Sequence, residues 1–257
     1  MPRYFIEVSY NGARYSGLQV QRNARTIQSA LEEALEVCFR KEFSLTGASR
    51  TDAGVHALQN YFHFDCDEEL MPEANDGRNN AGNRPKQLYS LNSLLPWDIV
   101  VRNIIKVKND AHSRFDATSR EYQYRIYQSK DPFLRDRAFF YPYRIDVNQL
   151  KEAAAIILNA NDFTSFSKRN TQVNNFTCSL KQSEWACSNE LLVYNVKGNR
   201  FLRGMVRGLV GTMLRVGSGK ISVSKFKEII ESKDCGNADF SVPPQGLFLI
   251  SVNYTFI

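Results

Sequence analysis

The sequence predicts an α+β fold built from two α/β domains with mixed, largely antiparallel sheets. Both halves of the chain combine segments of alternating polar and apolar residues, typical of strands, with segments of helical period. The chain has 257 residues, of which 43% are hydrophobic, and this is enough for two domains of ordinary size. We place the boundary near Asn109, which gives an N-terminal domain 1–109 and a C-terminal domain 110–257.

The N-terminal domain is predicted to combine strands with two helices. Residues 4–10 alternate as in a strand and stop at an Asn-Gly pair, which favours a turn, and residues 61–64 form a second strand pattern. Thr26 can cap a helix, because its hydroxyl accepts from a backbone N–H of the first turn. The apolar face of this helix comprises Ile27, Leu31, Ala34, Leu35, Cys38 and Phe39. A shorter leucine-rich helix ends at Pro96.

The C-terminal domain shows the same mixture. Residues 121–127 alternate as in a strand, and Asp146 begins a helix with Gln149 as its capping-box partner. Further elements follow in chain order: two hairpin strands near Trp185 and at 192–196, helices at about 201–216 and 222–231, and a closing strand at 248–256.

The distribution of charge favours an anionic partner. Lys and Arg outnumber Asp and Glu by 33 to 27, for a formal net charge of +6. Residues 191–227 contain no acidic residue, and the loop before the first predicted helix carries Arg14, Arg22 and Arg25 without a nearby acid. Such stretches are typical of a phosphate-binding surface, and a solvated basic face is the alternative.

Cysteine and histidine usage favours a cytoplasmic protein without a metal site. The five cysteines are odd in number and include no Cys-x-x-Cys pair, which fits reduced thiols. The three histidines have no metal-ligand spacing. No N-terminal signal pattern occurs, and no apolar run approaches the roughly 18 residues needed to cross a bilayer, so we expect no membrane association.

One loop, residues 47–56, stands out as a candidate active site. Its sequence Gly-Ala-Ser-Arg-Thr-Asp-Ala-Gly-Val-His places the carboxylate of Asp52 among small residues, which allow close approach of a backbone or ligand. Arg50 supplies positive charge for a phosphate or for Asp52 itself. Taken alone, an aspartate near a glycine is more often a simple turn residue.

Arg207 and Tyr122 are candidate partners of Asp52. On a helical wheel Arg207 lies between an apolar stripe and a band of glycines, where an unpaired guanidinium would be costly, so it is expected to pair with a carboxylate. The alternatives are that it reaches solvent or pairs with another acid. Tyr122 can stack on a nucleic-acid base or pack in the core, and periodicity does not distinguish it from Tyr124.

These residues lie in motifs that follow one another along the chain. Besides the loop 47–56, the motifs are Asn92–Asp98, Arg114–Tyr124, Asp162–Phe166, Met205–Gly211 and Gly246–Leu249. In this order they resemble the TruA-type tRNA pseudouridine synthase family from end to end. The resemblance implies two α/β domains that share a central RNA-binding cleft, a homodimer, and no metal or organic cofactor. It also implies conversion of uridine to pseudouridine at positions 38, 39 and 40 of the tRNA anticodon stem-loop.

The resemblance assigns roles to particular residues. Asp52 is the nucleophile, which either attacks the anomeric carbon or abstracts a sugar proton to open a glycal route. Arg50 helps to extrude the base, Arg207 pairs with Asp52, and Tyr122 contacts the target uracil. The residues expected to bind RNA are Arg14, Arg22, Arg25, Lys168, Arg169, Arg200 and Arg203.

Three departures from the family pattern leave the RNA target open. Ser49 stands where glycine is usual, Leu-Gln-Val-Gln at 18–21 replaces Trp-Gln-Arg-Gln, and the polar loop 76–84 resembles an insertion. The alternative function is therefore a catalytically inert or retargeted RNA-binding paralogue. A metal-dependent nuclease is disfavoured, because it needs clustered acids and Asp52 is a lone carboxylate among arginines.

Overall fold

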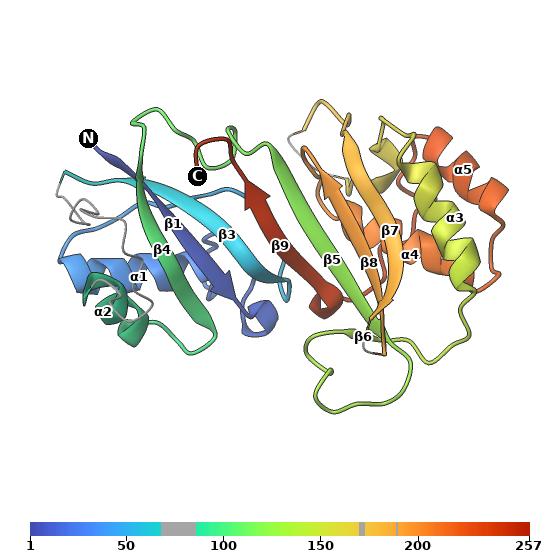
Figure 1. The fold of residues 1–257 in the computed structure, drawn as a ribbon, viewed down its shortest axis with the longest axis horizontal. Coiled ribbons are helices and arrows are strands. Elements are labelled where there is room, and N and C mark those ends of the chain that lie inside the picture. The colour runs from blue at the N-terminus through green and yellow to red at the C-terminus, as the bar shows by residue number, and fades with distance from the viewer. Residues whose placement is uncertain (68–85, 170–172, 189) are drawn as a thin grey trace. The chain divides into compact units, whose positions relative to one another are not determined.

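The fold is α+β, with mixed, mainly antiparallel strand pairing and five α-helices in the described residues, which confirms the α+β class but leaves the two-domain arrangement a prediction. A computed structural model describes residues 1–67, 86–169, 173–188 and 190–257. It divides into two compact units (Figure 1): unit 1 is Met1–Thr118 with Ser251–Ile257, and unit 2 is Ser119–Ile250. The predicted domains 1–109 and 110–257 stay a prediction.

Unit 1 contains an antiparallel sheet with β1 at its centre. Strand β1 (Arg3–Tyr10) pairs with β3 (His56–Asp65) on one side and with β4 (Ile99–Val107) on the other, and the short β2 (Thr46–Gly47) adds to β3. Helices α1 (Ile27–Phe39) and α2 (Lys86–Leu94) contact each other, and α2 contacts β4. A 3-10 turn, η1 (Gly12–Arg14), follows β1.

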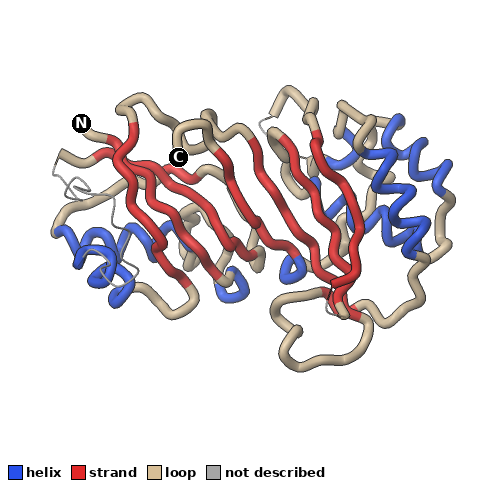
Figure 2. Tube along the Cα trace, in the orientation of Figure 1, coloured by secondary structure: helices blue, strands red, loops and turns tan. Residues whose placement is uncertain are grey.

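Unit 2 has a second group of strands with its own helices. The strands β5 (Ser119–Tyr127), β8 (Leu191–Gly198) and β7 (Leu180–Ser188) pair antiparallel in that order, and β6 (Phe139–Phe140) adds to β5 in parallel. Helices α3 (Val147–Ile157), α4 (Met205–Gly217) and α5 (Val223–Glu231) contact one another, and α3 covers β7 (Figure 2). Strand β9 (Leu247–Asn253) starts in unit 2 and ends in unit 1.

Most predicted elements and two helix caps are confirmed. The Thr26 hydroxyl accepts from the Ser29 N–H, and Ser29 Oγ accepts in return from the Thr26 N–H, both at 3.1 Å. Asp146 caps α3 by accepting from the backbone N–H groups of Asn148 and Gln149. The predicted capping box with Gln149 is wrong, because the Asp146 N–H donates to the Gly217 carbonyl at 2.8 Å. Strands β7 and β8 form the predicted hairpin. The polar loop 76–84 lies outside the described residues.

Several element boundaries differ from the prediction, and strand β3 begins at His56 instead of 61. Helix α4 begins at Met205 instead of 201, because Gly204 precedes it with a left-handed φ of 73°. Strand β9 ends at Asn253 instead of 256, although Tyr254 stays buried and its hydroxyl donates to the Ser113 carbonyl at 2.6 Å. Strands β4 and β6 were not predicted. In β4 a register shift opposite Glu7 and Val8 interrupts the alternation of side chains.

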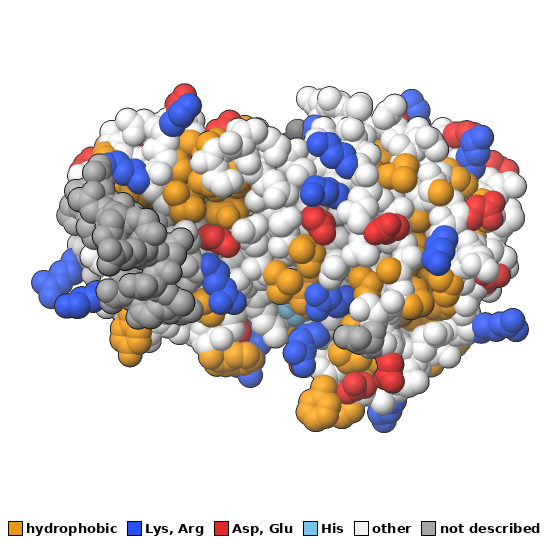
Figure 3. Space-filling model, in the orientation of Figure 1, with side chains coloured by type: hydrophobic (Ala, Val, Ile, Leu, Met, Phe, Trp, Pro, Cys, Tyr) orange, Lys and Arg blue, Asp and Glu red, His pale blue; other side chains and the backbone are white. Residues whose placement is uncertain are grey.

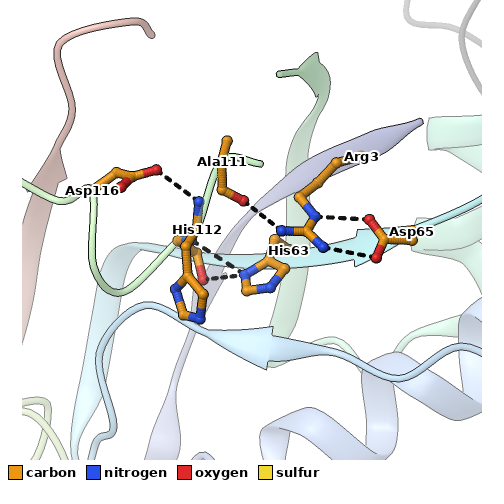
Figure 4. A network of polar contacts seen from close by, with 7 residues as sticks. Arg3, His63, Asp65, Ala111, His112 and Asp116 are labelled. Carbon is orange, nitrogen blue, oxygen red and sulfur yellow. Dashed lines mark hydrogen bonds and ion pairs between the residues drawn. The ribbon is translucent and has the colours of Figure 1, made fainter. Parts of the chain in front are cut away.

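In unit 1, a polar network joins the chain segment 111–116 to strands β1 and β3 (Figure 4). Arg3 and Asp65 face each other on β1 and β3, and their ion pair is bidentate at 2.7 and 2.8 Å. A third nitrogen of Arg3 donates to the Ala111 carbonyl at 3.0 Å. Nδ1 of the buried His63 lies 2.8 Å from the Ser113 hydroxyl and 3.2 Å from the Ser113 backbone nitrogen.

We expect the free energy of unfolding to fall as the pH drops from about 6.5 to about 4. Burial, with smaller contributions from His112 and Arg3, lowers the pKa of His63 from 6.5 to about 4. Between these values the unfolded chain binds a proton that the folded chain does not, so acid favours unfolding. The slope from this residue is at most about 1.4 kcal/mol per pH unit. Urea titrations at several pH values measure it.

His63→Asn is the matched variant, because its amide oxygen can accept near the position of Nδ1 but does not titrate. Its stability should vary less with pH than that of the wild type between about pH 6.5 and 5, above the range of most carboxylates. An unchanged slope would show that another group takes up the proton.

Candidate active site

Asp52 lies in the loop that joins β2 to β3, at the first position of a tight turn. The Val55 N–H donates to the Asp52 carbonyl at 3.2 Å, and Gly54 has a φ of 78° that favours glycine. Asp52 is half-buried, whereas Arg50 on the same loop is exposed. The turn therefore holds the carboxylate at the surface of unit 1 on a fixed backbone.

Gly17 packs directly against this turn. The backbone dihedral φ of Gly17 is 99°. A Cβ at this position would lie 3.0 Å from the Thr51 carbonyl oxygen and 3.3 Å from the Ala53 nitrogen. The next residue, Leu18, donates its N–H to the same Thr51 carbonyl at 3.0 Å. A side chain at Gly17 would separate the two segments, so glycine is required by both conformation and space.

Gly12 makes a second close approach, to Val55 at the end of the turn. A Cβ at Gly12 would overlap the carbonyl oxygen of Val55. The Gly12 N–H donates to Nδ1 of the buried His56 at 3.2 Å. A neutral imidazole that accepts at Nδ1 carries its proton on Nε2, so this contact sets the tautomer of His56.

Buried polar side chains fix the backbone just before Asp52. The Thr51 hydroxyl lies 2.8 Å from the Tyr10 hydroxyl. Asn60 Nδ2 donates to the Ser49 carbonyl at 2.9 Å and to the Tyr10 hydroxyl at 3.2 Å. The sequence analysis did not identify Tyr10 and Asn60 as part of the site. The one feature that could have pointed to them is a polar side chain in or beside a predicted strand.

The Asp52 carboxylate itself has no hydrogen-bond or ion-pair partner among the described residues of unit 1. The neighbouring Ser49 is buried, and its hydroxyl has no hydrogen-bond partner in the part of the chain that the structure describes. Backbone contacts therefore order the loop, and the carboxylate oxygens remain available for a ligand.

Tyr122 and Tyr124 share one face of β5 in unit 2. Tyr124 is fully buried and donates its hydroxyl to the Pro243 carbonyl at 2.7 Å, and burial raises its pKa. The Tyr122 ring meets Phe201 edge to face, with centroids 4.9 Å apart. Tyr122 is also buried, at 8% exposure, so contact of Tyr122 with a ligand stays a prediction.

Arg207 on α4 is half-buried and held by backbone carbonyls. Its Nε donates to the Val242 carbonyl at 2.8 Å, and Nη2 reaches the Phe240 carbonyl at 3.5 Å. These acceptors in unit 2 were not predicted, because the sequence suggested a carboxylate. A guanidinium has five N–H donors, so the remaining donors stay available to a carboxylate. The pairing of Arg207 with Asp52 stays a prediction.

The glycines of α4 explain how these carbonyls approach. A Cβ at Gly208 would lie 2.7 Å from the Phe240 ring, and a Cβ at Gly211 would overlap the Asp239 carbonyl oxygen. The helical wheel identified this small-residue band but not the segment that packs on it. The band lets the segment 239–242 lie against α4, and that contact orients Arg207.

The basic residues expected to bind RNA fall into two groups. Unit 1 carries Arg14, Arg22 and Arg25, all exposed, and unit 2 carries Lys168, Arg169, Arg200 and Arg203. The Lys168 N–H donates to the Arg203 carbonyl at 3.0 Å, whereas Arg169 pairs with Asp234 at 3.5 Å. Figure 3 shows basic and acidic side chains interspersed on the face in view.

The described residues hold neither a disulfide nor a cluster of metal ligands. All five cysteines are described there and are free thiols. In the described ranges, no three His, Cys, Asp or Glu side chains gather as metal ligands, and no helix combines the length and apolarity needed to cross a membrane.

The chain is similar to a large set of related proteins. A family model described as tRNA pseudouridine synthase matches residues 153–255. A protein of Parabacteroides distasonis named tRNA pseudouridine synthase A is 41% identical over 254 residues, which cover 99% of this chain and 96% of the relative. Proteins of the same name from Bacteroides fragilis and Staphylococcus aureus are 42% and 35% identical, over 98% and 96% of this chain and 96% and 89% of their own lengths.

Gly17→Ala should lower the free energy of unfolding by at least about 1 kcal/mol more than Gly219→Ala. Both glycines have positive φ, 99° and 73°, so both substitutions introduce backbone strain. Nothing lies within 4 Å of a Cβ at Gly219, whereas a Cβ at Gly17 presses on the Thr51 carbonyl. Urea unfolding followed by circular dichroism measures the difference. Equal losses would mean that the contact with the aspartate turn adds no constraint.

Proposed function

Because the chain belongs to the tRNA pseudouridine synthase family, we propose that Asp52 is the residue with which it converts uridine to pseudouridine in tRNA. The enzyme is an isomerase: the bond from C1′ to N1 of uracil breaks, and a bond from C1′ to C5 forms. The observation that carries the assignment is the backbone-ordered turn that holds the half-buried Asp52 carboxylate without a partner in unit 1.

Asp52 acts on the sugar of the target nucleoside by one of two routes. In the first, a carboxylate oxygen attacks C1′ and displaces uracil. In the second, the carboxylate removes a sugar proton, and a glycal forms as uracil leaves. In both routes uracil turns within a closed pocket and forms a bond from C5 to C1′. In the first route this breaks the ester bond from C1′ to Asp52, and in the second the carboxyl of Asp52 returns its proton to C2′. C5 then loses its proton. Exclusion of water matters because it prevents loss of the free base.

Arg207 and Tyr122 complete the proposed site in a cleft shared by the domains 1–109 and 110–257. The carbonyls of Val242 and Phe240 orient the Arg207 guanidinium, and its remaining N–H groups hold the Asp52 carboxylate in position. The Tyr122 ring holds the uracil and assists removal of the C5 proton, directly or through water. No metal or organic cofactor takes part.

The proposed substrate region is the anticodon stem-loop, at positions 38, 39 and 40. A uridine must leave the helix before Asp52 can reach its sugar, which costs a few kcal/mol. Exposed Arg50, two residues before Asp52, helps to extrude the base and fills its place. The RNA backbone binds to the basic groups of both units, and a homodimer in the cytoplasm provides two such surfaces.

A retargeted RNA-binding paralogue is the second candidate, and one observation favours it. Val20 is 49% exposed where the family pattern has arginine, so a surface cation is missing from the loop beside the aspartate turn. Leu18 also departs from the family pattern, but it is buried against Gly47, so this substitution affects the packing of the core and not the surface. On this second candidate, the chain differs from the family in its RNA target rather than in its chemistry.

The decisive experiment measures tritium release from C5-labelled uridine in an unmodified tRNA transcript, with EDTA present. We expect release by the wild type and none by Asp52→Asn, because the amide is neither a nucleophile nor a base. The variant should bind the same tRNA with a Kd close to that of the wild type. Release by Asp52→Asn would remove Asp52 from the chemistry. Binding without release by the folded wild type would support the inert or retargeted paralogue.

Arg207→Ala should lower kcat on the order of 10²-fold, because a carboxylate displaced by about 1 Å loses its reactive geometry. Arg215 on the same helix also donates to a backbone carbonyl, that of Asn237 at 3.3 Å, so Arg215→Ala is the matched control and should keep near wild-type kcat. Single-turnover release at saturating tRNA measures both variants. Equal kcat values for the two variants would remove Arg207 from the site.

A further inference from the structure

Trp97 is a large aromatic side chain that the fold leaves in solvent. It lies in the turn between α2 and β4, where the Ile99 N–H donates to the Pro96 carbonyl at 3.0 Å. Its side chain is 73% exposed, while the adjacent Asp98 is 7% exposed. The turn thus directs one side chain inward and the other outward. Packing of unit 1 does not account for the indole, because most of its surface contacts no protein.

A cation accompanies the exposed indole. The Arg14 guanidinium lies over the Trp97 ring, 5.4 Å from its centroid, and Arg14 is itself exposed. Cation–π contact favours this arrangement and holds both side chains near each other. An aromatic surface beside a guanidinium presents two features that an unpaired nucleotide recognises, since the base stacks on the ring and its phosphate meets the cation.

The Trp97 turn is joined firmly to the segment that supports the aspartate turn. The inward Asp98 accepts from the Tyr15 hydroxyl at 2.6 Å, and its carbonyl accepts from the Asn11 N–H at 2.9 Å. Residues 11–18 are the segment whose Gly12 and Gly17 pack against Val55 and Thr51. The exposed indole and the turn of Asp52 therefore belong to one ordered part of unit 1.

The charge around this surface favours RNA over a protein partner. Arg25 lies over the Tyr15 ring at 5.6 Å, and Arg14, Arg22 and Arg25 are all exposed. Asp98, the acid next to Trp97 in the sequence, is buried and accepts a hydrogen bond, so its carboxylate does not face solvent. The surface thus combines exposed cations with a single aromatic ring, which matches a strand of nucleic acid.

We propose that Trp97 and Arg14 form a stacking site for an unpaired nucleotide of the tRNA substrate, outside the residues that perform the chemistry. The proposal rests on tRNA being the substrate of this chain. Trp97 is a positioning residue: it contributes to binding and register of the RNA, and Asp52 supplies the reaction. Removal of the ring therefore weakens tRNA binding and leaves the chemical step in place.

The test compares Trp97→Ala with Tyr89→Ala, a matched control, because Tyr89 on α2 is also 73% exposed. We expect Trp97→Ala to raise the Kd and KM for tRNA about 5- to 100-fold, with kcat at saturating tRNA close to that of the wild type. Trp97→Phe should restore most of the affinity, because a smaller ring still stacks. Tyr89→Ala should bind tRNA as the wild type does.

Tryptophan fluorescence supplies a direct readout that a structural role would not alter. The chain has two tryptophans, and Trp185 is buried, so quenching by iodide reports mainly on Trp97. Unmodified tRNA should protect Trp97 from iodide in the Asp52→Asn protein, and a fully paired RNA duplex of similar length should not. Absence of protection by tRNA, or an unchanged KM for Trp97→Ala in an enzyme that releases tritium, would overturn the proposal. Absence of tritium release by the wild type would instead count against the proposed function.

Discussion

The close approach of two backbones at Gly12 and Gly17 is the constraint on which the site in unit 1 depends. A Cβ at either position would meet the carbonyl groups of Val55 or Thr51, so the segment 11–18 lies against the aspartate turn only because both side chains are absent. Backbone contacts of this kind are stiff, since no rotamer can relieve them. They fix the position of Asp52 without using its carboxylate, and through Asp98 they extend the same order to the turn of Trp97.

Unit 2 uses the same device for another purpose. Gly208, Gly211 and Gly246 let the chain around 239–243 pack against α4 and the ring of Tyr124, where any Cβ would collide. The carbonyls of that chain then accept from Arg207 and from the Tyr124 hydroxyl. Burying a guanidinium is unfavourable unless its donors are satisfied, and two carbonyls meet part of that requirement while keeping the charge. Arg207 is thus oriented but not neutralised within its unit.

Sequence periodicity predicted the elements whose pattern is local, and missed what depends on distant partners. The Thr26 cap and the faces of α1 and β5 follow from residues close in the chain. Strand β4 was not predicted because a bulge at Arg102 and Asn103 interrupts its alternation of polar and apolar residues. The start of α4 was placed too early because it depends on the φ of Gly204. The aspartate loop was identified from its small residues and from its resemblance to a family motif. No local pattern could show that the partner of Arg207 is a carbonyl 35 residues away.

The turn of Asp52 is ordered through its backbone, which leaves the carboxylate oxygens open to partners from outside unit 1. This is compatible with the proposed contact to Arg207, because the backbone positions the side chain before that contact forms. The structure orders Thr51 through Tyr10 and Ser49 through Asn60, and leaves the Asp52 side chain without such bonds in its own unit. Ser49 shows the limit of this ordering, since its buried hydroxyl has no acceptor in the described residues, a cost that glycine would avoid. The loop therefore tolerates a local loss of stability at Ser49 while the backbone contacts that position Asp52 are retained.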